Sequence, residues 1–255
     1  MQNQQPSTLK EIRVHGTQDF PCAFYQTGTR IRGNMVKHHW HEEVELLYFS
    51  GGEFCLEINM ERFEISEECF YFINPGELHS ISVEKNGGCV ENAVVFHMDM
   101  LSSAYALDQI QTNLIQPVQN GSIQFPRCLR KNEPAFEPVR KSYEEIRNVF
   151  GGDSFRENYY DGEAVTDDIT RQLFIKSALL RILAVLSANN LFEVTEKNHD
   201  RRIETIKTTL TYIQENYKEK IYIRDLADLI GMNEQYFCRF FKKVIGRSPM
   251  EYVNE

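Results

Sequence analysis

The feature that most constrains the fold is a change in residue pattern along the chain. Short segments with a β-strand pattern come first, and segments with a helical pattern follow. Between about residues 20 and 100, aromatic and β-branched segments alternate with turn signals at Gly51-Gly52, Asn74-Pro75-Gly76 and Asn86-Gly87-Gly88. These segments cover residues 43–50, 54–60, 63–66, 69–73, 79–84 and 92–98. Several short strands with frequent turns predict a sandwich or a barrel.

Helical periodicity takes over after about residue 134. Residues 136–150 have helical spacing, and residues 163–188 form a longer helical stretch with apolar positions at Ile169, Leu173, Leu180, Leu183 and Val185. These apolar positions outnumber what one contact with a barrel needs, so we expect this helix to contribute to a homodimer. A helix packed wholly on its own barrel is the alternative. Asn189-Asn190 predicts a stop, and residues 195–200 predict a linker.

The composition is that of a globular protein. The 255 residues are 42% hydrophobic and 25% charged, which suits one large domain or two modest ones. There is no apolar run of about 18 residues, and the polar N-terminus does not resemble a signal peptide, so we expect a cytoplasmic protein. The six cysteines form no CxxC pair and are expected to be reduced thiols in or near the core: Cys22, Cys55, Cys69, Cys89, Cys128 and Cys238.

Charge is unevenly distributed along the chain. The net charge is −9, yet residues 201–255 hold ten Lys or Arg against eight Asp or Glu. The remainder holds 18 basic against 29 acidic residues. An acidic body joined to a mildly basic C-terminal part is compatible with DNA binding by that part, but it does not decide the question.

The densest polar cluster lies just before the first predicted strands and contains His39, His41 and Glu45. All three numbers are odd, so in one strand the three side chains would point to the same face. Two imidazoles and a carboxylate can hold a divalent metal or hydrogen-bond a polar ligand. His79 follows a Pro-Gly turn that begins another strand. Hydrogen-bonded barrel histidines without any ligand are the structural alternative.

These residues resemble the first motif of the cupin superfamily, Gly-x5-His-x-His-x3-Glu-x6-Gly, which here runs from Gly33 to Gly52. The second motif is met poorly, because His79 comes one residue early and Cys69 replaces the leading glycine. The phrase NPGELHS is similar to the cupin sensor domains of AraC-type regulators. The resemblance implies a small β-barrel with four residues near its mouth, as effector-binding residues and candidate metal ligands: His39, His41, Glu45 and His79.

The C-terminal part has the pattern of a helix-turn-helix. Residues 203–216 and residues 221–230 predict two helices, and Gly231 stands where the second would end. Asn233 is a good N-cap for a third helix that runs to about Ile245. Two short helices joined by a tight turn with glycine are typical of this motif.

The predicted third helix has two faces. An apolar stripe at i, i+3, i+4 and i+7 would pack on the preceding helices: Phe237, Phe240, Phe241 and Val244. A polar set at the same spacing would face elsewhere: Gln235, Cys238, Arg239 and Lys242. That face has the size and chemistry to enter a major groove, and a merely solvated face is the alternative.

The string from Asp225 to Val253 resembles the DNA-binding signature of AraC-type (AraC/XylS) transcription regulators. It carries residues of that signature in family order: Leu226, Ala227, Gly231, Met232, Tyr236, Phe237, Phe241, Lys242, Gly246, Ser248, Pro249 and Tyr252. The resemblance implies base reading by Gln235, Cys238 and Arg239, although Cys238 is a weak hydrogen bonder. It also implies a second helix-turn-helix beyond a connecting helix, so we expect the sequence to be cut short after the helix start at Ser248-Pro249.

The sequence therefore predicts an α+β chain, with an N-terminal cupin-like β-barrel, then helices, then a C-terminal all-α helix-turn-helix segment. We expect a sensing barrel in residues 1–130, a helical dimerisation segment and linker in residues 131–200, and a DNA-binding part in residues 201–255. The predicted function is a homodimeric transcription regulator, more often an activator in this family, with DNA and a small polar effector such as a carbohydrate as partners. No cofactor beyond a divalent metal is implied. The alternatives are a metal-dependent cupin isomerase or dioxygenase and a metal- or sugar-binding module without a DNA role.

Overall fold

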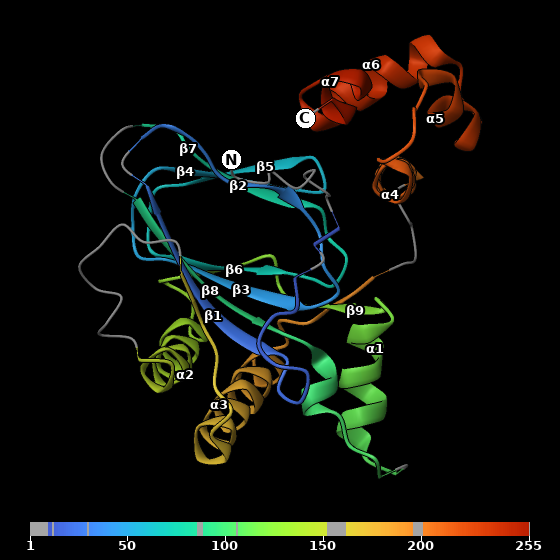
Figure 1. The fold of residues 1–255 in the computed structure, drawn as a ribbon. Coiled ribbons are helices and arrows are strands. Elements are labelled where there is room, and N and C mark those ends of the chain that lie inside the picture. Colours follow the sequence, from blue (N-terminus) through green and yellow to red (C-terminus); the bar gives the residue numbers. More distant parts are fainter. Residues whose placement is uncertain are drawn as a thin grey trace. The chain divides into compact units, whose positions relative to one another are not determined.

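The computed structural model describes residues 10–11, 13–29, 31–85, 89–105, 107–151, 162–195 and 201–254. The predicted turn at residues 86–88 and residues 196–200 of the predicted linker lie outside these described residues. The chain divides into two compact units (Figure 1). The larger comprises residues 13–37 and 42–197, and the smaller comprises residues 1–12, 38–41 and 198–255.

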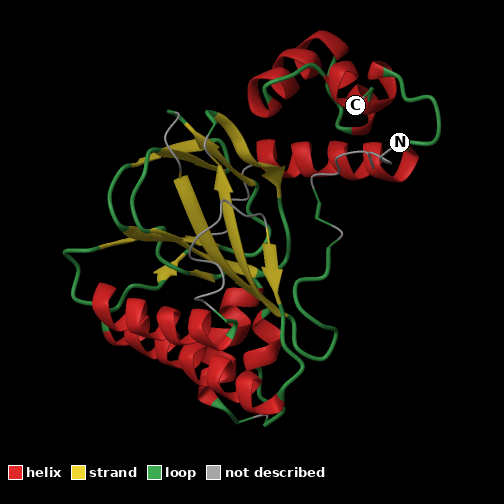
Figure 2. Cartoon of the chain, turned by 60° about the vertical axis from the view of Figure 1, so that its left-hand side comes forward, coloured by secondary structure: helices red, strands yellow, loops and turns green. Residues whose placement is uncertain are grey.

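Two antiparallel sheets make up most of the larger unit, and they face each other as layers (Figure 2). A six-stranded sheet has the order β10-β6-β3-β8-β1-β11, and a four-stranded sheet has the order β2-β7-β4-β5. The strands are β1 (Cys22–Thr29), β2 (Gly33–His39), β3 (Val44–Phe49), β4 (Phe54–Ile58), β5 (Glu61–Ile65), β6 (Cys69–Ile73), β7 (His79–Val83), β8 (Cys89–Phe96), β10 (Cys128–Arg130) and β11 (Gly162–Ala164). A further pair joins β9 (Ile123–Gln124) to β12 (Glu193–Val194). The fold class predicted from the sequence is confirmed, although the two sheets do not close into one continuous barrel.

The six-stranded sheet is a middle layer, and the burial of its strands follows from that position. On β6 all five residues are buried, because odd-numbered residues such as Tyr71 pack between the sheets while Phe70 and Phe72 pack against helices. β5, in the outer sheet, buries Ile65 but leaves Glu61 and Glu64 exposed. The near-continuous apolar run of residues 69–73 is thus the sequence signature of a strand covered on both faces.

Helices α2 (Phe136–Val149) and α3 (Ile169–Ala188) cover the outer face of the six-stranded sheet (Figure 2). The helix predicted from residue 163 begins later, because residues 162–164 pair with β1 as β11. Asp168 caps α3 by accepting the backbone N–H of Arg171 at 2.7 Å. The predicted stop is confirmed, since α3 ends at Ala188 and Asn190 takes a φ of 53°. Between β8 and β9 lie the short helices η1 (Met98–Leu101), η2 (Gln111–Ile115) and α1 (Gln116–Gln119).

The C-terminal part contains α4 (Arg201–Asn216), α5 (Ile223–Leu229), α6 (Glu234–Ile245) and α7 (Pro249–Val253). The second helix starts two residues later than predicted, because Tyr222 is extended and its N–H donates to Asp225 Oδ2 at 3.1 Å. The predicted N-cap is confirmed, since Asn233 Oδ1 accepts from Tyr236 N at 2.8 Å. Gly231 has a φ of 65°, which suits the tight turn between α5 and α6.

The apolar face of α6 forms the core of this helical part. Phe237 and Phe241 are completely buried, and Leu226 of α5 joins them. Phe240 and Val244 are half-buried. The predicted apolar stripe is therefore confirmed, although these two residues are more exposed than Phe237 and Phe241. Across the described residues, no helix combines the length and apolar character needed to cross a membrane.

Candidate functional site

The histidine and glutamate residues singled out in the sequence come from three structural elements. His39 is the last residue of β2, His41 lies in the connection that follows, and Glu45 is the second residue of β3. His79 is the first residue of β7, after the turn that contains Pro75 and Gly76. The expectation of one strand with one shared face was wrong, because β2 ends at His39 and the chain crosses there from one sheet to the other.

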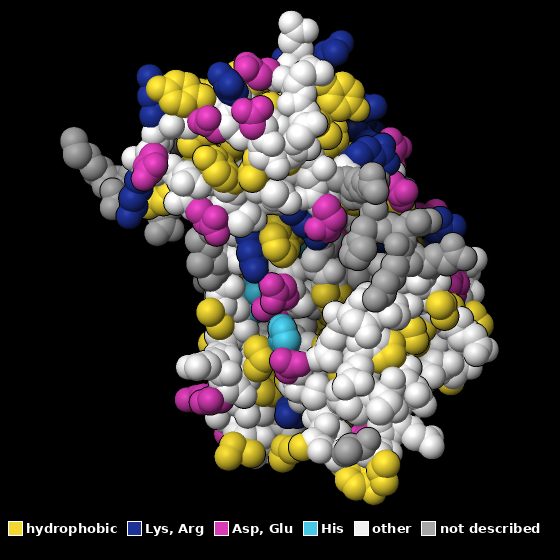
Figure 3. Space-filling view, turned by 90° about the vertical axis from the view of Figure 1, so that its right-hand side faces the viewer, with side chains coloured by type: hydrophobic (Ala, Val, Ile, Leu, Met, Phe, Trp, Pro, Cys, Tyr) yellow, Lys and Arg dark blue, Asp and Glu magenta, His cyan; other side chains and the backbone are white. Residues whose placement is uncertain are grey.

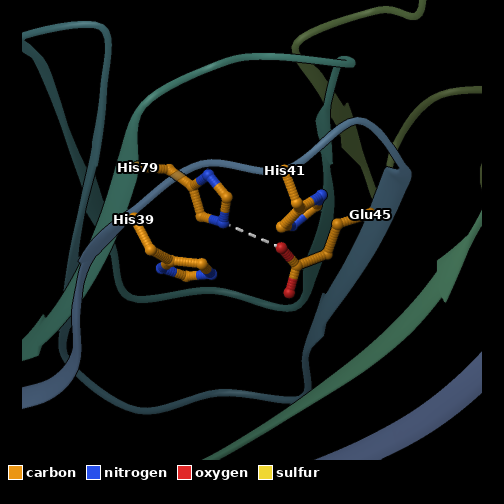
Figure 4. A group of neighbouring side chains, drawn as sticks. All are labelled: His39, His41, Glu45 and His79. Carbon is orange, nitrogen blue, oxygen red and sulfur yellow. Dashed lines mark ion pairs between the residues drawn. The ribbon is translucent and has the colours of Figure 1, made fainter. Parts of the chain in front are cut away.

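The four side chains nevertheless meet (Figure 4). Each offers one nitrogen or oxygen atom, and these atoms all lie within 4.8 Å of one another. His79 Nε2 is 2.9 Å from Glu45 Oε2, and the rings of His39 and His41 have centroids 5.6 Å apart. His41, Glu45 and His79 are buried, so the interactions of these polar groups are only weakly screened by water.

The orientation of His79 is set by its own turn. Nδ1 lies 2.8 Å from the Glu77 carbonyl oxygen, which can only accept, so the proton belongs on Nδ1. That assignment directs Nε2 toward the carboxylate of Glu45. Two acceptors at this distance are bridged by a shared proton or by a bound cation. The chemistry of the donor set, three imidazoles and one carboxylate, fits a divalent metal.

Glu77 holds this turn in place through a buried network that the sequence did not reveal. Its carboxylate accepts two hydrogen bonds from the Arg127 guanidinium, at 2.7 and 2.5 Å. It also accepts from the backbone N–H of Asn74 at 2.8 Å and from Asn59 Nδ2 at 3.0 Å. The bidentate pair with Arg127 neutralises a carboxylate whose side chain is 7% exposed.

Two further residues extend the cluster. Glu11, His15 and His41 form a second group whose nitrogen and oxygen atoms lie within 4.8 Å of one another. Glu11 Oε2 is 3.5 Å from His39 Nε2, and His15 Nδ1 is 2.7 Å from the Tyr25 hydroxyl. Sequence reasoning missed both residues, because they lie in a polar N-terminal stretch without a motif.

The proposed DNA-contacting residues lie on α6. Gln235, Arg239 and Lys242 are exposed, and Cys238 is half-buried. Burial raises the pKa of the Cys238 thiol, which keeps it neutral and a weak hydrogen bonder. In the upper part of Figure 3, Lys and Arg side chains are interspersed with Asp and Glu, as the small basic excess of residues 201–255 requires.

Comparison with known proteins identifies both parts of the chain. Residues 24–147 match the family described as "AraC-like ligand binding domain", and residues 213–254 match "Bacterial regulatory helix-turn-helix proteins, AraC family". The chain belongs to the AraC family. Both resemblances noted in the sequence are thereby confirmed, and the protein is a regulator with a ligand-binding and a DNA-binding part.

Individual relatives can be aligned with nearly the whole length of this AraC-family chain. It is similar to the "Uncharacterized HTH-type transcriptional regulator YdeC" of Bacillus subtilis, with 26% identity over 96% of this chain and 78% of that protein. Among solved structures, a variant of ToxT from Vibrio cholerae shares 10% identity over 94% of this chain and 80% of its own, with a TM-score of 0.42. The AraC-like transcriptional activator CuxR shares 9% identity over 94% and 76%, with a TM-score of 0.39.

Proposed function

We propose that this AraC-family regulator is an activator whose cupin domain binds a small polar metabolite, such as a carbohydrate, at His39, His41, Glu45 and His79. The observation that carries the proposal is the convergence of these side chains, from both sheets, on one point in a largely buried position. Binding sites for small molecules place a few polar groups in this manner within an apolar frame. We assign sensing to residues 1–130, dimerisation and the linker to residues 131–200, and DNA binding to residues 201–255.

The chemistry of the cluster favours an oxygen-rich ligand. The Glu45 carboxylate accepts hydrogen bonds from hydroxyl groups, and imidazoles can donate or accept them. A divalent cation held by the same four residues would supply a fixed positive charge that orients the oxygen atoms of the ligand. Burial of His41 and His79 strengthens each of these interactions relative to an exposed site.

We propose that the cluster senses and does not catalyse. A catalytic metal cupin needs a bound metal with an open coordination position in every active chain. A sensor needs only a shaped pocket with a few placed polar groups. Metal content and turnover therefore separate the two functions, and partial or exchangeable metal occupancy without turnover of sugars or small acids is the result expected for a sensor.

We further propose that α3 joins two copies of the chain. One side of α3 already packs into the core of the larger unit through Ile175, Leu179 and Ile182. Its other side exposes large apolar side chains: Ile169 at 73%, Leu173 at 62%, Phe174 at 59% and Leu180 at 44%. An exposed apolar patch of this kind is typical of an interaction surface. A second copy would cover it, and a dimer suits the paired half-sites that helix-turn-helix regulators read.

The test of the proposed sensing function is thermal unfolding of the full chain against a panel of sugars and small organic acids. A ligand at 100 times its dissociation constant adds about 2.7 kcal/mol to the free energy of unfolding, which gives a clear rise in Tm. Glu45→Gln combined with His79→Ala should abolish that rise. A matched control, Glu137→Gln combined with His97→Ala, changes the same residue types away from the cluster and should retain it.

Two results would contradict the proposed sensing function. A rise in Tm that survives in the double variant would place the effector elsewhere. One metal per chain together with a reaction that the same double variant loses would identify a cupin enzyme.

A further inference from the structure

A second group of chemically competent side chains lies at the other end of the sandwich. On β6, Ile73 pairs with Glu45 of the histidine cluster, whereas Cys69 pairs with Phe49 at the far end of β3. Four residues of strand separate these two ends, which corresponds to about 13 Å. The surroundings of Cys69 are therefore spatially separate from the histidine cluster.

Strand register brings a second cysteine to the same place. β10 pairs with β6 so that Cys128 faces Tyr71 and Arg130 faces Cys69. Residues two apart in a strand share a face, so Cys69 and Cys128 are diagonal neighbours on adjacent strands. Both belong to the apolar cluster between the two sheets. A cavity of about 170 Å³ is lined by both cysteines, by Tyr71 and by Arg130.

The two thiols differ in exposure and in acidity. Cys69 is buried, and Cys128 is half-buried beside the cavity. A hydrogen bond from the Cys69 thiol, another from the Tyr71 hydroxyl and the charge of Arg130 lower the pKa of Cys128 to about 7, against the opposing effect of burial. The same hydrogen bond to Cys128, together with burial, raises the pKa of Cys69.

Acidic side chains complete the surroundings. Glu64, Glu67 and Glu68 also line the cavity, and their negative charge opposes a thiolate. Glu68 is neutralised by Lys131 at 2.6 Å, and it accepts a hydrogen bond from the Tyr48 hydroxyl at 2.7 Å. The hydrogen bonds and the guanidinium act directly on Cys128, so they lower the pKa of its thiol despite these carboxylates, and a substantial share of it is thiolate near neutral pH.

We propose that Cys128 and Cys69 form an oxidation site, in which the Cys128 thiolate reacts with a hydroperoxide and Cys69 resolves the product as a disulfide. The arrangement has the parts that this chemistry needs: an accessible thiolate with hydrogen-bond donors and a positive charge around it, and a second thiol within reach. The site would give the sensor domain a covalent input at a place separate from the histidine cluster.

The reaction balances with the hydroperoxide as the oxidant. The Cys128 sulfur attacks the terminal peroxide oxygen, the O–O bond breaks, and an alcohol or water leaves while sulfur is oxidised by two electrons to the sulfenate. After protonation to the sulfenic acid, the Cys69 sulfur attacks the Cys128 sulfur. The S–S bond forms, the S–O bond breaks, and the oxygen leaves as water with the proton of Cys69.

Closing the disulfide requires a small movement of β10. Diagonal partners in a sheet have Cα atoms about 7–8 Å apart, and a disulfide needs less than about 6.8 Å. β10 is a three-residue strand at the edge of the six-stranded sheet, with Arg127 just before it held to Phe72 and Glu77, so the shift toward β6 is confined to the residues of β10. Oxidation would thus change the edge strand that leads into α2.

Mass spectrometry of the full chain tests the proposed oxidation site. Treatment with hydrogen peroxide should lower the intact mass by two hydrogens, with a crosslinked peptide that joins Cys69 to Cys128. Cys69→Ser should instead leave Cys128 as a sulfenic acid that dimedone traps, and Cys128→Ser should give neither product. The matched control Cys238→Ser should form the disulfide as the parent chain does, and so should Glu45→Gln combined with His79→Ala. No crosslink in the parent chain, or a crosslink to another cysteine, would overturn the proposal.

Alkylation of the parent chain measures the acidity of Cys128 directly. The rate at which iodoacetamide labels Cys128 in the parent chain should rise with pH through a midpoint of about 7. An ordinary thiol with a pKa near 8.5 is about 3% thiolate at pH 7, so after the lower nucleophilicity of a more acidic thiol is counted, Cys128 should react roughly threefold faster. Arg130→Gln removes a positive charge and should raise the midpoint. A midpoint at or above 8.5 in the parent chain would overturn the assignment of Cys128 as the reacting thiolate.

Discussion

At the scale of single residues, the geometry of the sensing cluster depends on a side chain that does not belong to it. Arg127 contacts the Glu77 carboxylate twice and also donates to the Phe72 carbonyl oxygen at 3.0 Å. Glu77 in turn carries the carbonyl group that orients His79. The ion pair between Arg127 and Glu77 is therefore linked to the direction in which His79 Nε2 points.

Arg127→Ala should destabilise the protein because it leaves the carboxylate of Glu77 buried without its countercharge. Hydrogen bonds from Asn74 and Asn59 remain, so we expect a loss of roughly 2–3 kcal/mol in the free energy of unfolding. The measurement is urea denaturation. Arg140→Ala is the matched control, since its ion pairs with Glu137 and Glu144 are largely exposed, and it should cost less than about 1 kcal/mol. Equal losses in both variants would contradict the role given to Arg127.

DNA recognition is also argued at this scale. If Arg239 reads a base pair, Arg239→Ala should cost roughly 1–3 kcal/mol of specific binding and relax the preference at one position of the site. Lys242→Ala should weaken binding to all sequences alike and lower the dependence of log K on log salt by about one. Fluorescence anisotropy with specific and random duplexes at several salt concentrations measures both effects. An Arg239→Ala variant with unchanged specific affinity would remove that residue from the groove.

At the scale of elements, the sequence predicted strands well wherever composition and turns agreed. Residues 44–49, 54–58 and 69–73 became strands within the predicted segments, since aromatic and β-branched runs bounded by turns have few other ways to be buried. His39, His41 and Glu45 could be predicted from their spacing, and the resemblance to cupins added His79, but the path of the chain that brings them together could not be predicted. The argument that odd-numbered residues share one face assumes a continuous strand, but the chain leaves β2 directly after His39. Glu11, His15 and Arg127 could not be predicted, because they meet the cluster only through tertiary packing.

The exposed side of α3 makes a prediction about assembly. Leu173→Glu places a charge in the middle of the apolar surface, where a partner helix would have to desolvate it. A central interface residue contributes about 2 kcal/mol or more, so the dimer dissociation constant should rise at least about 30-fold. Arg171→Glu introduces the same charge on a different side of α3 and serves as the matched control. Sedimentation velocity that finds the parent chain monomeric at micromolar concentrations would contradict the dimer.

At the scale of the whole molecule, charge is divided unevenly between residues 201–255 and the rest of the chain. The part outside residues 201–255 is strongly acidic, and the helical C-terminal part is slightly basic. An acidic body repels the phosphate backbone, so general attraction to DNA is weak and base contacts must supply more of the affinity. Control by a ligand then needs only a modest change in how the DNA-binding part is presented.

Coupling between effector binding and DNA binding must be reciprocal, and this gives the last prediction. If an effector bound at the histidine cluster raises affinity for operator DNA by some factor, operator DNA must raise affinity for the effector by the same factor. Typical coupling is 1–3 kcal/mol, so we expect a factor of about 5–150. Calorimetric titration of the ligand found by thermal unfolding, with and without an operator duplex selected from random sequences by the protein, measures one side of this cycle. DNA titration with and without the ligand measures the other. Glu45→Gln combined with His79→Ala should lose the coupling while it keeps the DNA affinity of the ligand-free protein. Equal ligand affinity with and without operator would show that the sensing and reading functions are not coupled in this chain.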